Sequence, residues 1–136
     1  MSAIIVDTGP LVAYLNAGDE NHAWAVRQFA SLHEPVLTCD AVWVETMHLY
    51  LKRGGSAPRV WILLRSGTVK LAFHLDTEFE SVAQLMDRYA DVPMDLADAC
   101  LVRMSEQHRD CRVFTTDSDF KIYRRYGRQV IPLISL

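Results

Sequence analysis

The chain has 136 residues, of which 50% are hydrophobic and 23% are charged, and its formal net charge is −3 at pH 7. These values are typical of a globular protein, and the length favours a single domain over residues 1–136. The acidic balance does not favour a general polyanion binder, so contact with a nucleic acid requires local basic patches or a bound metal ion.

No apolar stretch has the ~18–20 residues that a membrane-spanning helix needs. The N-terminus also lacks the basic and apolar regions of a signal peptide, so we expect a cytoplasmic protein. The three cysteines, Cys39, Cys100 and Cys111, have no C-x-x-C spacing. They predict neither a disulfide framework nor a zinc site, and we expect reduced, mostly buried thiols.

Short apolar runs alternate with helical patterns along the chain. The predicted strands cover residues 3–6, 36–38, 68–74, 112–115 and 129–134. The predicted helices cover residues 10–16, 21–33, 41–53, 56–65, 77–89, 95–108 and 118–126. Asp40 is predicted to cap the third helix. This alternation predicts a three-layer α/β/α sandwich with a mainly parallel central sheet.

The first strand ends abruptly in Asp7, Thr8 and Gly9. Its continuous apolar run fits a strand that is buried on both faces in a parallel sheet. Ligand-binding groups lie just beyond the carboxyl ends of such strands, so Asp7 is a candidate site residue. The alternative is that Asp7 only caps the following helix.

Asp117 occupies the corresponding position after the predicted strand 112–115, with Thr116 immediately before it. Parallel strands end at the same edge of a sheet, so the pattern favours a shared site with Asp7. Asp119 is predicted to cap the short helix that follows.

Glu45 lies in the predicted helix 41–53 on the same face as Val42 and Leu49. An ionised carboxylate in an apolar stripe costs several kcal/mol if it has no partner. Glu45 therefore either points into a polar pocket or hydrogen-bonds to the neighbouring His48.

Asp98 is a second carboxylate that faces inward, because Leu101 and Val102 lie on its side of the predicted helix 95–108. The preceding Asp95 is predicted to cap that helix. A purely structural role for Asp98, as the acidic partner of a capping box, is the alternative.

Several carboxylates are held close together most economically by a divalent cation, because like charges otherwise raise one another's pKa. Oxygen ligands without a His or Cys cluster favour Mg²⁺ or Mn²⁺ over zinc. Such an ion orients a phosphate and activates water, which indicates phosphodiester hydrolysis.

Four motifs occur in a specific order along the chain: I-I-V-D-T, V-x-x-E-T-x-x-L, D-L-A-D-A and V-F-T-T-D-S-D-F. Together they resemble the PIN-domain ribonucleases, and most closely the VapC-type toxins of bacterial toxin–antitoxin pairs. The resemblance implies a PIN-like fold and metal-dependent endoribonuclease activity. It implies an acidic quartet of Asp7, Glu45, Asp98 and Asp117, metal ligation by Asp7, Asp98 and Asp117, and supporting roles for Thr8, Thr116 and Asp119.

The same resemblance implies an RNA substrate, a small antitoxin as partner and a homodimer. Trp24, Trp43 and Trp61 are candidates for protein contacts, although core packing is the alternative for each. Two basic groups are candidates for contact with an RNA backbone, with a solvated surface as the alternative. They are Lys52, Arg53, Arg59 and Arg65 in the first group, and Arg124, Arg125 and Arg128 in the second.

Three other classes of protein could also contain acidic residues in this arrangement, and each makes different demands on the sequence. A phosphatase with an aspartyl nucleophile places a second Asp two residues after the first, where this chain has Gly9. A receiver domain needs a phosphoacceptor Asp after a middle strand and a Lys after a late strand, and neither is evident. A PIN-like module that binds RNA or a partner without cutting stays open, because intact acids do not by themselves establish activity.

Overall fold

The structure is a computed structural model, and it describes residues 2–136. Its helices and strands fall into three consecutive parts of the chain. The first part is β1 (Ala3–Val6), α1 (Thr8–Leu15), α2 (His22–Ala30), β2 (Val36–Thr38) and α3 (Asp40–Lys52). The second is α4 (Ala57–Arg65), β3 (Val69–Leu71), α5 (Leu75–Arg88), α6 (Leu96–Gln107) and β4 (Cys111–Phe114). The third is the 3₁₀ turn η1 (Ser118–Lys121), β5 (Arg124–Arg125), β6 (Gln129–Val130) and β7 (Leu133–Ile134).

The central sheet has five strands in the order β3-β2-β1-β4-β7. Each neighbouring pair in it is parallel. The chain leaves β1 toward β2 and later returns to β4 on the other side of β1, so the strand order reverses beside β1. Such a switch point is where open α/β sheets bind ligands.

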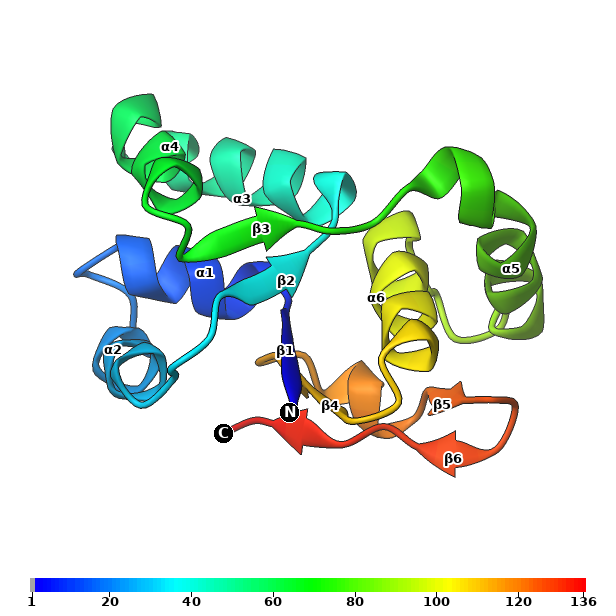
Figure 1. The fold of residues 1–136 in the computed structure, drawn as a ribbon. Coiled ribbons are helices and arrows are strands. Elements are labelled where there is room, and N and C mark those ends of the chain that lie inside the picture. Colours follow the sequence, from blue (N-terminus) through cyan, green and yellow to red (C-terminus); the bar gives the residue numbers. More distant parts are fainter. Residues whose placement is uncertain (1) are drawn as a thin grey trace.

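Helices cover the sheet as predicted, and the α/β/α architecture is confirmed (Figure 1). In Figure 1, α1 and α2 lie on one side of the sheet and α5 and α6 on the other, while α3 and α4 lie beside β3. The apolar run of β1 explains its central place, because Ile5 and Val6 have no exposed surface. Side chains from both helical layers, such as Leu11 of α1 and Leu101 of α6, pack fully buried against the sheet.

Two predicted helix caps are wrong. Asp40 lies in the first turn of α3, and Cys39 occupies its N-cap position without a side-chain cap bond. The carboxylate of Asp117, not of Asp119, caps η1, because it accepts a 2.9 Å hydrogen bond from the backbone N–H of Asp119. A helix can begin one or two residues earlier or later than its cap pattern indicates, and these errors are of one and two residues.

The predicted helix 118–126 and strand 129–134 are each replaced by shorter elements. Only Ser118–Lys121 is helical, as a 3₁₀ turn, and β5 and β6 then form an antiparallel hairpin with Tyr126 at a φ of 55°. The final strand is interrupted before Pro132, which has no N–H to donate, and β7 pairs with β4.

The cysteine prediction is confirmed, because Cys39, Cys100 and Cys111 are buried free thiols. Within residues 2–136, no helix has the length and apolar character needed to cross a membrane.

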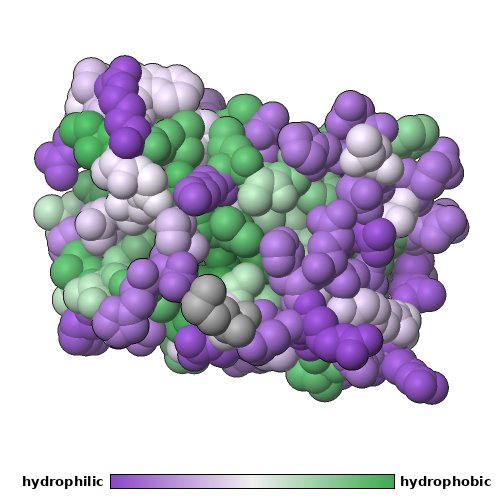
Figure 2. Space-filling view, in the orientation of Figure 1, coloured by the Kyte–Doolittle hydropathy of each residue, from purple (hydrophilic) through white to green (hydrophobic). Residues whose placement is uncertain are grey.

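The surface is uneven in polarity. Figure 2 shows polar residues over the right of the view, where α5 and α6 lie, and more apolar surface toward the left.

Candidate active site

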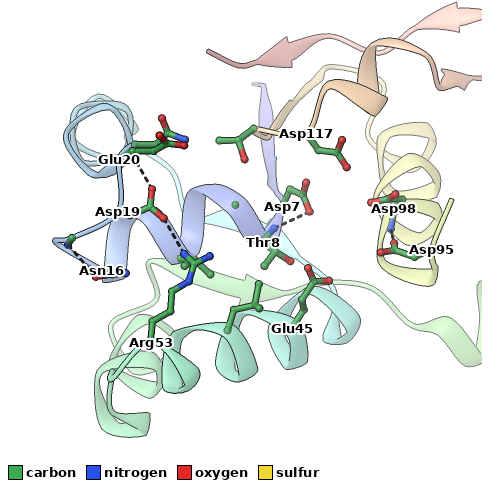
Figure 3. Close-up of a pocket in the computed structure, with 16 residues that line it drawn as sticks. Asp7, Thr8, Asn16, Asp19, Glu20, Glu45, Arg53, Asp95, Asp98 and Asp117 are labelled. Carbon is green, nitrogen blue, oxygen red and sulfur yellow. Dashed lines mark hydrogen bonds and ion pairs between the residues drawn. The ribbon is translucent and has the colours of Figure 1, made fainter. Parts of the chain in front are cut away.

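The register of β1 and β4 brings two acids together at one edge of the sheet. Val6 pairs with Phe114, and the backbone N–H of Asp7 donates a 2.9 Å hydrogen bond to the carbonyl of Phe114. Asp7 and Asp117 therefore leave the ends of adjacent strands toward the same space, as the sequence predicted. Figure 3 shows both side chains beside the pocket at this edge of the sheet.

Asp7 caps α1 and also faces the cavity, so the two alternatives for this residue hold together. Its Oδ1 accepts a 2.8 Å hydrogen bond from the N–H of Thr8, and its Oδ2 accepts a 2.7 Å bond from the Thr115 hydroxyl. Burial raises the pKa of Asp7 to about 6, and the charges of Asp117 and Glu45 add to that rise. The two hydrogen bonds act in the opposite direction, since they stabilise the ionised form.

Glu45 reaches the same cavity from α3, whereas His48 is exposed and is not part of the cavity lining. The polar-pocket alternative for Glu45 is therefore the one that the structure supports. Burial raises the pKa of Glu45, and the negative charges of Asp95 and Asp117 raise it further.

Asp98 reaches the cavity from α6, where Asp95 is the N-cap as predicted. Asp95 Oδ1 accepts a 2.8 Å hydrogen bond from the backbone N–H of Asp98. The Asp98 carboxylate instead accepts a 2.9 Å bond from the hydroxyl of Tyr123, which is fully buried. Burial raises the pKa of Asp98 to about 7, and the nearby carboxylates Asp95, Asp7 and Asp117 contribute.

These four acids line one cavity of about 630 Å³. Sequence reasoning missed several of its other lining residues, all of which belong to the turn between α1 and α2: Asn16, Gly18, Asp19, Glu20 and Asn21. Arg53, a member of the first basic group, also lines the cavity from the end of α3, eight residues after Glu45. Asp95 also lines the cavity in addition to its role as a cap.

A family model of the PIN domain matches residues 4–126, a range that contains all four acids. The chain belongs to the PIN domain family. The resemblance found in the sequence is thus confirmed, and two similar proteins are of the VapC type.

Ribonuclease VapC26 of Mycobacterium tuberculosis (strain ATCC 25618 / H37Rv) is 28% identical to the chain over 116 residues, which cover 84% of this chain and 86% of that protein. A crystal structure of VapC20 from Mycobacterium tuberculosis, a toxin that cleaves the sarcin-ricin loop, aligns with a TM-score of 0.77 and 27% identity. That alignment covers 96% of this chain and 100% of VapC20.

In this PIN domain the hydroxyl of Thr115 contacts two of the acids, whereas the resemblance had implied a supporting hydroxyl at the next residue, Thr116. Within residues 2–136, the buried hydroxyl of Thr8 has no hydrogen-bond partner. The Thr116 hydroxyl packs against Gly9, where a Cβ would overlap it. Asp119 does not line the cavity. Thr8 and Thr116 do line it, so their supporting roles stay predictions.

One member of the second basic group of this PIN domain, Arg125, does not lie on the surface, whereas Arg128 is exposed. Arg125 is buried, and its guanidinium donates to the Ser105 carbonyl at 2.9 Å and to the Cys111 sulfur at 3.4 Å. Arg124 donates to three backbone carbonyls nearby. The structure therefore does not support a role for Arg125 in RNA contact, because its charged group lies inside the protein.

The donor set of the cavity fits a hard divalent cation. It offers carboxylate oxygens from α3, from α6 and from the ends of β1 and β4, and, at Thr8, a buried hydroxyl that has no partner among the described residues. Burial, with a further contribution from neighbouring negative charges, raises the pKa of Asp7, Glu45 and Asp98, and a bound cation would favour their ionised forms. As these side chains stand, no three His, Cys, Asp or Glu residues within 2–136 converge closely enough to enclose an ion.

Proposed function

We propose that this PIN domain is an endoribonuclease that hydrolyses RNA phosphodiester bonds with the help of Mg²⁺ or Mn²⁺, as the toxin of a toxin–antitoxin pair. The observation that carries the proposal is the convergence of Asp7, Glu45, Asp98 and Asp117 on one cavity at the switch point of the sheet. The similar proteins named as a ribonuclease and as an RNA-loop-cleaving toxin support it.

Asp7, Asp98 and Asp117 would hold the divalent ion, with the buried hydroxyl of Thr8 beside them. When bound, such an ion offsets the charge of a phosphate and lowers the pKa of water. Asp7 is kept in place for this role because Thr8 and Thr115 fix both of its oxygens. Tyr123 orients Asp98 in the same way through one oxygen.

Glu45 comes from α3 and is not among the proposed metal ligands, which leaves its carboxylate to accept the proton of the attacking water. Its burial and its acidic neighbours raise its pKa and so strengthen it as a base. The oxygen of that water bonds to phosphorus, the bond between phosphorus and the 3′ oxygen breaks, and the leaving 3′ oxygen takes up a proton from solvent. The products are a 5′-phosphate and a 3′-hydroxyl.

The partners proposed from the family are a small antitoxin and a second copy of the chain, in the cytoplasm, with residues 1–136 forming one PIN-like domain. Exposed apolar side chains on α3 and α4 support a protein contact on that side. They are Val44, Leu51, Trp61 and Ile62. Trp43, in contrast, is buried beside Trp61, with 6.3 Å between ring centroids, and Trp24 packs on Phe114.

Incubation with total RNA tests the proposal. New RNA ends should appear with Mg²⁺ and not with EDTA, and sequencing of those ends should give defined cleavage positions. The matched variant Asp98→Asn keeps the size of the side chain and should abolish the new ends. If wild-type protein binds RNA yet produces no new ends in Mg²⁺ or Mn²⁺, the chain is an RNA-binding module without nuclease activity.

A further inference from the structure

One face of α3 presents both a carboxylate and a guanidinium to the cavity. Glu45, Leu49 and Arg53 recur at intervals of four residues, and all three line it. The Cα atoms of Glu45 and Arg53 are eight residues apart, or ~12 Å along the helix axis. Arg53 therefore lies toward one end of the cavity, and the four acids proposed for catalysis lie toward the other end (Figure 3).

The lining of the cavity is strongly acidic, and Arg53 supplies a positive charge to it. Seven of the lining residues are carboxylates, and Arg53 is the only Lys or Arg among the lining residues in the described range 2–136. An RNA strand that enters this cavity meets strong repulsion from the acids. A metal ion offsets that repulsion only near Asp7, so a second cation is needed where the strand continues.

Asp19 holds the guanidinium at this position. Arg53 Nη1 donates to Asp19 Oδ2 at 3.3 Å, and Asp19 Oδ1 accepts a 2.9 Å hydrogen bond from the N–H of Asn21. Asp19 is thus fixed by its own turn, and its side chain is 15% exposed, whereas that of Arg53 is 52% exposed. The guanidinium has five N–H donors, so those that face solvent stay available to a second anion.

We propose that Arg53 binds a backbone phosphate of the RNA next to the phosphate that is cleaved. The inference rests on the proposed function for the identity of the anion as RNA. Guanidinium groups bind phosphate oxygens through paired hydrogen bonds, which suits a group held in one orientation by Asp19. The ~12 Å along α3 between Glu45 and Arg53 keeps Arg53 outside the reaction itself, so the phosphate that it binds is a different one from the phosphate that is cleaved.

Binding of a randomised 20-nucleotide RNA pool, measured by fluorescence anisotropy in Mg²⁺, tests the inference. All proteins carry Asp98→Asn, so that the RNA stays intact. Arg53→Gln should raise Kd about five- to tenfold and reduce the slope of log Kd against log salt by about 0.7, the value for one phosphate contact to a single strand. Arg109→Gln removes the same charge from an exposed turn before β4, at the other end of the sheet, and should change neither quantity appreciably.

Asp19→Asn separates phosphate binding from a purely structural ion pair. If Arg53 binds phosphate, Asp19→Asn removes the competing negative charge but keeps an amide oxygen that can accept from the guanidinium and hold it in place, so Kd should stay unchanged or fall. If the pair only ties α3 to the α1–α2 turn, both variants should weaken binding together with an equal loss of Tm, and the inference is wrong. It is also wrong if Arg53→Gln binds RNA as tightly as its parent.

Cleavage by the Asp98-intact protein keeps this inference separate from the proposed function. Arg53→Gln should raise KM while kcat stays within about threefold, because the contact is equally present in the ground and transition states. Loss of binding without any cleavage by the parent protein would uphold Arg53 and overturn the nuclease. Cleavage of RNA by Arg53→Gln with the same KM as its parent would uphold the nuclease and overturn the role of Arg53.

Discussion

The hydroxyl of Thr115 donates a 2.7 Å hydrogen bond to Oδ2 of Asp7, although the two residues lie 108 positions apart. The same hydroxyl oxygen accepts a 2.9 Å bond from the N–H of Asp117. One buried side chain thus joins the ends of β1 and β4 and fixes two of the four acids relative to each other.

Thr115→Val removes this link while keeping the shape of the side chain. The variant should lose about 1–3 kcal/mol of unfolding free energy, because a buried N–H loses its acceptor, and RNA cleavage should fall at least tenfold. Urea unfolding and an initial-rate assay measure the two effects. Thr46→Val is the control, since it removes a buried hydroxyl that bonds only to the Val42 carbonyl of its own helix. Equal activity in both variants would show that Thr115 has no part in the site.

Asp95 and Asp98 should respond differently to amide substitution, although both line the cavity. Asn is about as good an N-cap as Asp, so Asp95→Asn should keep its bond to the N–H of residue 98 and much of the activity. Asp98→Asn removes a proposed metal ligand and should abolish cleavage. Similar losses in the two variants would mean that Asp95 is more than a cap.

Crowded carboxylates should make the metal-free protein less stable than its amide variant. Asp98→Asn removes one of the repelling charges, and its amide oxygen can still accept from the Tyr123 hydroxyl. In EDTA the variant should therefore melt at the same temperature as wild type or a few degrees higher. With Mg²⁺ the advantage should shrink or reverse, because the ion stabilises only a protein that retains the site. A clear loss of Tm in EDTA would argue against a shared acidic cavity.

The stability advantage of Asp98→Asn over wild type in EDTA should also depend on pH. The pKa of Asp98 is about 7 in the folded protein against 3.8 for an unperturbed Asp, so the native state holds its proton more tightly than the unfolded chain does. Its contribution to stability is complete below pH ~4 and is lost as pH rises through 7. In EDTA, the gap between Asp98→Asn and wild type should therefore widen between pH 5 and pH 8, by about 1–3 kcal/mol. A constant or narrowing gap in urea titrations would contradict the raised pKa.

The sequence was enough to predict the architecture and the positions of the four acids. Apolar runs that end in Asp, and carboxylates on inward helix faces, are local patterns, and they predicted the fold around Asp7 and Asp98. The contacts of Thr115 and Tyr123 could not be predicted, because each joins residues that only the folded chain brings together. The hairpin after η1 was missed for a related reason, since its pairing and the positive φ of Tyr126 depend on tertiary contacts to Glu106.

The terminal chemistry of cleaved RNA tests the central claim most directly, because it reports which nucleophile attacked phosphorus. Water activated at the acidic cavity should leave 5′-phosphate and 3′-hydroxyl ends, with no cleavage in EDTA. Ligation-dependent sequencing that distinguishes the end groups gives the answer for wild type and Asp98→Asn side by side. Cyclic 2′,3′-phosphate ends, or full activity in EDTA, would contradict hydrolysis by the four carboxylates.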